Sequence, residues 1–397
     1  MLGHQQRFTA YRVLSRSYFH LTILFVFFYD RDFSLPVVEV ALAAYGVTLA
    51  VAAVVVKPLA KRLSLTGAVV TGEFLKALGL LLLAAPGGLP VAVVAQVIAA
   101  LGFSLASGTD SALLAEICRK DGSDARSWES RSGSLTFAAA LVAGVLGAIV
   151  YQASTLAPFF LSAAMSVLAA LTASTIGRGA PAPTSTPPAQ PARTAAPSAT
   201  ANGTVLRWSS YYAVVRGFVL ALFIGFLPYL LYVRLQVALP VFGLVLGAYT
   251  LSGFFTARYG RLAVDRFGAR TTAAACAALA GAGLLILLWQ PNAGGAAVAT
   301  VALGAGVGAV RPVSVGAISA VLDGQENTVK AAALRANEAR FAVVNTVLVL
   351  LAGLALDRVS FPHLLLGITV GYLVLAAVTV AALPRPARQG TEQPATA

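Results

Sequence analysis

Long apolar segments separated by short polar turns run along nearly the whole chain. Twelve of them are long enough to cross a membrane as helices, for which about 20 apolar residues suffice. They are predicted at residues 15–34, 36–57, 66–85, 90–115, 134–152 and 156–175, and then at 209–233, 236–257, 271–289, 296–322, 341–357 and 362–383. Asp30, Arg31 and Asp32 interrupt the first segment. The pattern predicts an all-α membrane protein with twelve transmembrane helices.

The two halves of the chain repeat each other at a fixed offset. Four pairs of matching residues align without a gap when the sequence is shifted by 204 residues: Tyr45 with Tyr249, Arg62 with Arg266, Gly79 with Gly283, and Gly102 with Gly306. We therefore expect two pseudo-symmetric six-helix bundles, residues 1–176 and 208–384. Parallel repeats of this kind are an architecture for moving a solute across a bilayer.

Residues 177–207 break the apolar pattern. The stretch GRGAPAPTSTPPAQPARTAAPSATANGTV at 177–205 is rich in Pro, Ala, Ser and Thr. Such a stretch cannot bury enough apolar surface to fold by itself. We expect a flexible cytoplasmic linker at 177–207 and a cytoplasmic tail at 385–397.

Composition supports the membrane assignment. The chain is 58% hydrophobic and 11% charged, far from the values of a soluble domain. Its net charge of +13 raises the question of nucleic-acid binding. The Lys and Arg residues, however, concentrate in alternate turns, as the positive-inside rule predicts for a bacterial inner membrane protein. We therefore expect the bacterial inner (cytoplasmic) membrane, both termini in the cytoplasm, and no nucleic-acid partner.

Motifs for catalysis or cofactor binding are not found. The two cysteines, Cys118 and Cys276, have no metal-ligand spacing around them. Gly304, Gly306 and Gly308 lie inside an apolar span with no preceding strand, so they are interpreted as close-packing positions and not as a dinucleotide loop. There is no Walker loop and no catalytic constellation. The chain is predicted to be no enzyme and to need no cofactor or metal.

The turn after the eighth predicted helix reads RLAVDRFGAR at 261–270. It resembles the signature loop of the major facilitator superfamily, which recurs between helices 2 and 3 of that fold. A carboxylate at a helix N-terminus is stabilised by about 0.3–1 kcal/mol through the helix dipole. The first-half turn, KPLAKRLS at 57–64, departs from the signature, with Lys61 in place of the acid. We expect a conformational latch on the cytoplasmic side, formed by Asp265, Arg266, Arg270, Lys61, Arg62 and Glu116. The alternative is a solvated turn.

A second resemblance concerns the fourth predicted helix. GFSLASGTDSALLAE at 102–116 and ESRSGS at 129–134 are similar to the end of helix 4 and the following loop in twelve-span drug-efflux members of the superfamily. Asp110 and Glu116 match the acids of that region. The glycine-proline motif of helix 5, typical of antiporters, is missing here. The resemblance implies a transporter that works by alternating access, with a cavity lined by helices 1, 4, 7 and 10.

Charged residues inside predicted spans are the candidate substrate site. Each costs about 2.5–3.5 kcal/mol at mid-membrane, so it is expected to face a cavity or a partner. Arg216, Arg311 and Asp110 lie on helices that the resemblance places around the cavity. The functional interpretation is that the arginines hold an anionic or polar group of the substrate while Asp110 balances them or exchanges a proton. The alternative is an interhelical ion pair that only closes the bundle.

Glu73 and Lys76 lie three residues apart on the third predicted helix, so they share a face and can pair. The structural interpretation is an ion pair within the helix. The functional alternative makes Glu73, like Asp110, a proton-coupling residue.

The function predicted from these features is secondary active transport, with protons driving export of a small drug-like or natural-product compound across the lipid bilayer by a monomer. One alternative is uptake of an organic anion through the same fold, motivated by Arg216 and Arg311. Another, from a different class, is a non-transporting membrane sensor or partner protein, which would leave solute distribution unchanged.

Overall fold

The computed structural model describes residues 3–56, 59, 62–107, 109–177, 199–323, 325, 327–356 and 358–384. These residues form helices, turns and loops, without a strand. Eleven helical stretches within them are long and apolar enough to cross a membrane. Lys61, one of the predicted latch residues, lies outside the described residues, as does the predicted tail at 385–397.

The first half contains eight helices within the described residues. They are α1 (His4–Ser15), α2 (Leu24–Tyr29), α3 (Leu35–Val55), α5 (Leu65–Ala84), α6 (Leu89–Ser107), α7 (Asp110–Asp121), α8 (Ala125–Ala153) and α9 (Ala157–Gly177). The predicted boundaries of the second and third spans agree with α3 and α5 to within two residues. The fourth predicted span is divided into α6 and α7.

The second half repeats this plan. Its elements are α10 (Ala199–Ala221), the π-helical turns η1 (Leu222–Phe226) and η2 (Tyr229–Arg234), α11 (Leu239–Phe267), α12 (Ala269–Trp289), α13 (Ala293–Gly308), α14 (Val310–Val321), α15 (Asn327–Leu356) and α16 (Phe361–Ala382). Residues 199–207, expected in the linker, belong to α10 instead. The fourth span of this half is also divided, at Ala309, which Pro312 explains because proline prevents a hydrogen bond to the preceding turn.

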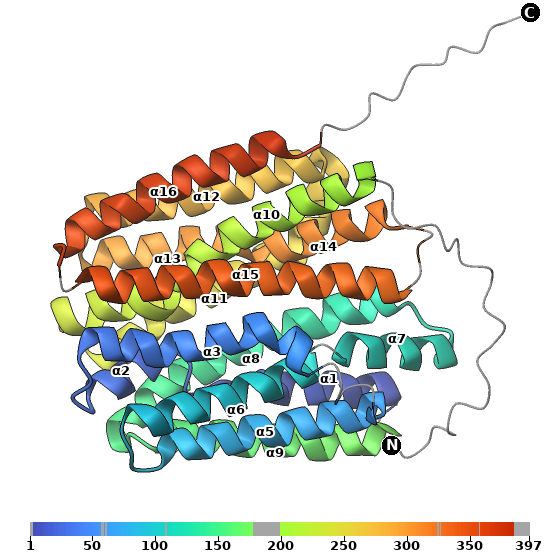
Figure 1. Ribbon diagram of the computed structural model, residues 1–397, viewed down its shortest axis with the longest axis horizontal. Helices are drawn as coiled ribbons and strands as arrows, with labels where there is room; N and C mark the ends of the chain where they lie inside the picture. The colour runs from blue at the N-terminus through green and yellow to red at the C-terminus, as the bar shows by residue number, and fades with distance from the viewer. Residues whose placement is uncertain are drawn as a thin grey trace, which may run out of the picture.

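The long helices run side by side, with the first half below and the second half above in Figure 1. The start of α1, the end of α9, the start of α10 and the end of α16 lie at the same end of the molecule, which we call the termini end. The opposite end is called the far end. α2 and the start of α3 lie at the far end (Figure 1).

The first predicted span is not a continuous helix. α1 ends at Ser15 and α2 begins at Leu24, with turns between them. Together the two short helices run from the termini end toward the far end (Figure 1). Non-helical backbone at membrane depth is tolerated only where protein or a water-filled cavity surrounds it. The break therefore marks a place where the neighbouring helices supply polar partners.

The repeat seen in the sequence is also found in the helix contacts of the two halves. A β-carbon added at Gly102 of α6 would lie 2.5 Å from the Gly72 carbonyl oxygen and 2.6 Å from the Lys76 nitrogen on α5. At Gly306 of α13 it would lie 2.8 Å from the Cys276 oxygen and 2.6 Å from the Ala280 nitrogen on α12. The residues of the first contact correspond to those of the second at the offset of 204 residues. The repeated glycines therefore allow the third and fourth spans of each half to pack backbone to backbone.

Replacement of Gly306 by alanine is expected to lower the melting temperature (Tm) of the detergent-solubilised protein, since overpacking a tight contact costs about 1–3 kcal/mol. Gly316→Ala is the matched control, because a β-carbon at this α14 position would meet nothing within 4 Å. An equal Tm for both variants would contradict the close-packing role of Gly306.

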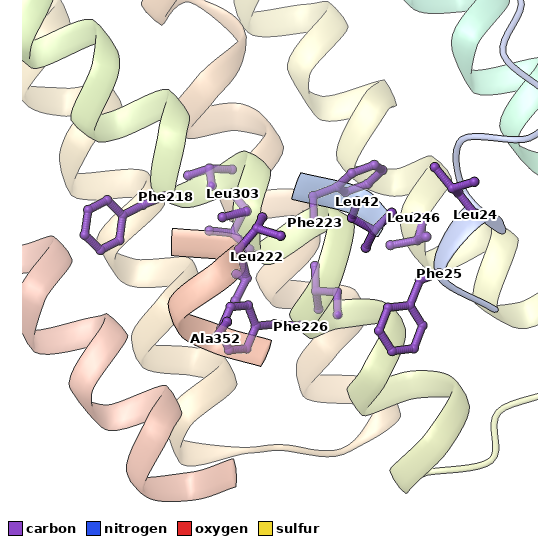
Figure 2. Close-up of a cluster of buried hydrophobic side chains, with 14 of the residues drawn as sticks. Leu24, Phe25, Leu42, Phe218, Leu222, Phe223, Phe226, Leu246, Leu303 and Ala352 are labelled. Atoms are coloured by element: carbon purple, nitrogen blue, oxygen red, sulfur yellow. The ribbon is translucent and has the colours of Figure 1, made fainter. Parts of the chain in front are cut away.

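The two halves meet along two seams, α3 against α15 and α8 against α11. A hydrophobic cluster continues from one half into the other: Leu24, Phe25 and Leu42 of the first half lie near Phe223, Phe226 and Leu246 of the second (Figure 2). At the far end the Tyr232 hydroxyl donates a 2.8 Å hydrogen bond to Asp30, which also accepts one from Tyr151. We call these contacts together the far-end joint.

Candidate functional site

A buried charge cluster lies inside the first half. The guanidinium of Arg12 contacts Asp110 at 3.2 Å and Glu129 at 2.8 Å. It also donates to the hydroxyl groups of Ser132 and Ser111. The side chains of Arg12 and Asp110 are only 7% and 3% exposed. Arg12 is therefore fully occupied by partners within its own half.

Arg16 stands where α1 has ended, beside this cluster. Its guanidinium is 3.8 Å from Asp110, a longer contact than that of Arg12. It also donates to the Tyr18 hydroxyl and lies 4.7 Å from the centre of the Phe103 ring. Because Asp110 is already bound by Arg12, Arg16 has no carboxylate of its own among the described residues.

Glu73 and Lys76 form the predicted pair, with 2.7 Å between Lys76 Nζ and a Glu73 oxygen, so the pairing is confirmed. Both groups also bind the broken end of α1. Lys76 donates to the Ser15 carbonyl oxygen at 3.0 Å, and the Ser15 hydroxyl donates to Glu73 at 2.6 Å. A cation that binds the last carbonyls of a helix stabilises its end. This geometry favours the structural interpretation of the pair.

The second half carries a more accessible cluster. Arg216 of α10 and Arg311 of α14 each contact one oxygen of Glu338 on α15, both at 3.2 Å. The Tyr212 hydroxyl donates to Glu338 and is also hydrogen-bonded to Arg216. Arg216 lies 4.4 Å from the centre of the Phe341 ring. Two guanidinium groups thus share a single carboxylate.

Exposure distinguishes the two clusters. Arg12 and Arg216 are related by the offset of 204, and each is bound by an acid of its own half. The side chains of Arg216 and Arg311 are nevertheless 31% and 54% exposed, against 7% for Arg12. The first-half cluster is therefore closed to a ligand in this conformation, whereas the second-half cluster can be reached.

The two clusters together contain more cations than acids. In the first half the Arg16 guanidinium and the Tyr45 ring both contact the Phe103 ring. In the second half the Tyr249 ring stacks on Phe223. Four guanidinium groups, of Arg12, Arg16, Arg216 and Arg311, are balanced by the three carboxylates of Asp110, Glu129 and Glu338. The surplus is one positive charge.

The proton-coupling candidates Asp110 and Glu73 are both buried beside a cation. A residue that carries a proton through a transport cycle must be able to leave such a partner. Proton transfer at either carboxylate would therefore require the pair to separate in another conformation. The coupling role of both residues stays a prediction.

The structure corrects the physical basis of the predicted latch. Asp265 does not lie at a helix N-terminus, because α11 continues through Phe267, ten residues beyond its predicted end. Asp265 is instead in the last turn of α11, exposed and 3.7 Å from Arg261. A carboxylate at this position opposes the negative end of the helix dipole. The expected dipole contact is therefore wrong.

Three other latch residues, Arg266, Arg270 and Glu116, form contacts within their own halves. Arg270 donates to the Ala381 carbonyl oxygen at the end of α16, and Arg266 packs on the neighbouring Phe267 ring. Glu116 pairs with Lys120 one turn later, while Arg62 is exposed. A latch between the halves at the termini end remains a prediction for another conformation.

Several functional candidates were missed from the sequence. Arg12 lies just before the predicted span at 15–34 and Arg16 at its start, so neither was considered for the site, and Glu338 lies before the predicted start of its helix at residue 341. Glu39 was overlooked, although no other charged residue occurs in α3. That isolated acid in an apolar span was a signal that could have been used. Among the described residues no group of three His, Cys, Asp or Glu side chains could hold a metal ion.

The far-end joint allows a direct test. Tyr232→Phe removes the hydrogen bond to the Asp30 side chain, worth about 0.5–1.5 kcal/mol for a bond open to solvent, and is expected to loosen the joint. The distance between spin labels at Ser34 and Gln236 should lengthen or become bimodal. Tyr229→Phe is the control, because the Tyr229 ring packs on Phe361 away from Asp30. Unchanged distances in Tyr232→Phe would contradict a stabilising role for this bond.

No protein-family model and no curated protein sequence matches this chain. Solved structures do match it. The nucleoside transporter NupG is 11% identical, with 97% of this chain and 100% of that chain covered and a TM-score of 0.71. A peptide transporter POT in complex with sulfate is 15% identical, with 96% and 94% covered and a TM-score of 0.70. A POT family transporter in complex with 5-aminolevulinic acid is 10% identical, with 95% of both chains covered and a TM-score of 0.74.

At these identities the likeness establishes the fold. The chain has the all-helical fold of these membrane transporters, over nearly its whole length. Its eleven candidate spans and this fold indicate a multi-pass membrane protein. The neighbours are transporters and not enzymes. They give the transporter fold expected from the sequence resemblance but do not extend to its efflux subtype.

Proposed function

We propose that this protein is a secondary transporter that works by alternating access and binds a substrate with an anionic group. The single observation that carries the proposal is the accessible pair Arg216 and Arg311 on one shared carboxylate. Two guanidinium groups on one acid leave a donor fork free, and such a fork suits carboxylate or phosphate oxygens. A fixed cation inside a membrane protein is commonly a ligand counter-ion.

The proposed architecture completes the twelve-span plan. The broken segment α1–α2 supplies the first crossing, so that each half contributes six crossings to its own bundle. The halves, residues 4–177 and 199–382, are joined by a cytoplasmic linker and rock about the centre between Arg16 and Arg216. With both termini in the cytoplasm of a bacterium, the far-end joint closes the periplasmic side, and exchange with the cytoplasm takes place at the termini end.

A second candidate function is proton-coupled export of a drug-like compound by a monomer. The observation in its favour is the set of carboxylates within the spans, Asp110, Glu73 and Glu39, because a carrier driven by protons needs an acid that changes its charge during the cycle. The two candidates share one fold and differ in substrate class. Export of an anionic compound in exchange for protons would agree with both candidate functions.

The substrate class is tested by binding to the purified protein. A ligand that binds the native state raises Tm. A panel of carboxylates and phosphates should contain compounds that raise Tm, whereas their uncharged amide or ester analogues should not. The same compounds should lose their effect on Arg216→Ala. Stabilisation by neutral or cationic compounds alone would contradict an anionic substrate.

A transport assay distinguishes the proposed transporter from the alternative, a membrane sensor. A membrane sensor would bind the same anion and leave its distribution across the membrane unchanged. Proteoliposomes loaded with the stabilising anion therefore distinguish a transporter, which exchanges it, from a sensor, which retains it.

A further inference from the structure

One buried acid at the far end has no role in the clusters described so far. Glu39 lies on α3, close to its far-end start, and its residue is only 2% exposed. One of its carboxyl oxygens is buried without a hydrogen-bond partner. No hydrogen bond or ion pair to Glu39 occurs among the described residues. Burying an ionised carboxylate without a cation costs far more than burying the neutral acid.

The side chain of Glu39 fits between two helices of the other half. A β-carbon added at Gly353 of α15 would lie 2.4 Å from both Glu39 Cβ and Cγ. One added at Gly225 of η1 would lie 2.8 Å from a Glu39 carboxyl oxygen. Gly225 also lies in a π-helical turn, a local widening that occurs frequently at functional sites. Both glycines leave room for this one acid at the interface between the halves.

The surroundings of Glu39 are apolar. Leu42 is one turn further along α3, while Phe226 and Ala352 neighbour the two glycines in sequence, and all three belong to the buried cluster of Figure 2. Water can therefore reach the Glu39 carboxyl group only if the apolar side chains of this cluster, which belong to the far-end joint, move apart. The carboxyl group is thus shielded from water while the joint is closed.

Charged groups on the elements around Glu39 are distant along their helices, exposed to solvent or already bound. Arg216 and Arg234 are each nine residues from Gly225, about 14 Å along a helix. On α15 the nearest charged residues, Arg340 and Glu338, are 13 and 15 residues before Gly353, and Arg358, beyond the end of that helix, is exposed to solvent. At the end of α2, Asp30 accepts hydrogen bonds from Tyr151 and Tyr232. α6, which also packs on α3, has no charged residue. Asp357 lies outside the described residues.

We propose that Glu39 is a proton-binding site of the far-end joint, which closes when the carboxyl is protonated and opens when it is ionised. The proposal rests on alternating access as the proposed function and adds the residue that links it to pH. The closed state binds a proton that the open state releases, so rising pH favours opening. For one linked proton the open-to-closed ratio changes by up to about tenfold per pH unit.

The test measures the joint directly and needs no substrate. Ala43→Cys places a reporter at a buried α3 position one turn from Glu39, in a background with Cys118→Ser and Cys276→Ser. In nanodiscs both faces experience the same pH. Labelling rates at each pH are divided by the rate of a reporter at exposed Ala238, which corrects for thiolate formation. The corrected Ala43→Cys rate should rise several-fold from acidic to alkaline pH.

Glu39→Gln has the shape of the protonated acid and cannot ionise. Its corrected labelling should stay low at every pH, whereas Glu39→Asp should keep a pH-dependent rise. A Glu39→Gln protein that follows the parent's pH course would overturn the proposal, even if transport is later demonstrated. A flat course in the parent would overturn it as well. Should Glu39→Gln not fold, the Glu39→Asp protein provides the test. If that protein elutes as a single species and its labelling no longer rises with pH, the proposal is overturned.

Discussion

Replacing Arg216 by alanine is expected to abolish or nearly abolish movement of the anionic substrate while the protein remains folded. A hydrogen bond to a charged group contributes about 1.5–3 kcal/mol, which corresponds to a loss of about ten- to a hundredfold in affinity. Folding should persist because Glu338 keeps Arg311 and Tyr212 as partners. Counterflow of the labelled substrate in proteoliposomes measures the effect.

Two further variants separate charge from geometry. Arg261→Ala removes a cation of the same kind from an exposed position on α11 and should transport at the parent rate. Arg216→Lys keeps the charge but loses the planar fork, so partial activity would indicate that charge alone suffices. Parent-level transport by Arg216→Ala would exclude it from the substrate site. Arg311→Ala should also lower transport, by a smaller factor because Arg311 is more exposed.

The second large effect concerns the clamp on the broken first segment. Lys76→Ala leaves Glu73 buried without its cation, and such a loss costs about 3–5 kcal/mol. It also removes the donor to the Ser15 carbonyl at the end of α1. We expect a sharply lower Tm and poor recovery of folded protein from the membrane.

The repeat supplies the matched control. The residues equivalent to Glu73 and Lys76 in the second half are Ala277 and Ala280. The double variant Glu73→Ala with Lys76→Ala should therefore be more stable than Lys76→Ala alone, because no charge is left unpaired. If the single variant is as stable as the parent, the structural role of the pair is wrong. If the double variant retains proton-driven transport, Glu73 is not the proton carrier.

The helices were largely predictable from the sequence, and their breaks were not. Runs of apolar residues located α3, α5, α12 and α16 within a few residues, because a membrane requires a minimum apolar length. The same reasoning ended the eighth span at residue 257, whereas α11 continues through Phe267. Hydropathy detects burial in lipid and not the hydrogen bonds that extend a helix into water. The break after Ser15 was missed for a related reason, since Lys76 and Glu73 stabilise it from another helix.

The candidate site was predicted in part. Arg216 and Arg311 were identified because a charge in an apolar span is conspicuous. Both form ion pairs between helices, but the acid is Glu338, whereas the predicted partner Asp110 pairs with Arg12. Glu338 itself lies in the polar stretch before the predicted span at 341–357, where apolar length gives no signal, although KAAALRANEAR at 330–340 is rich in helix-forming residues. Glu39 was visible as an isolated acid, but its place between Gly225 and Gly353 depends on residues about 190 and 310 positions further along the chain. No local pattern can report such a contact.

The most direct test of the proposed transport is substrate counterflow by the purified protein. Proteoliposomes preloaded with an anion that raises Tm should accumulate the labelled form of the same anion from outside, and liposomes with Arg216→Ala should not. Neutral analogues should be excluded in both cases. Absence of counterflow for every stabilising anion, or equal counterflow in the Arg216→Ala protein, would contradict the account.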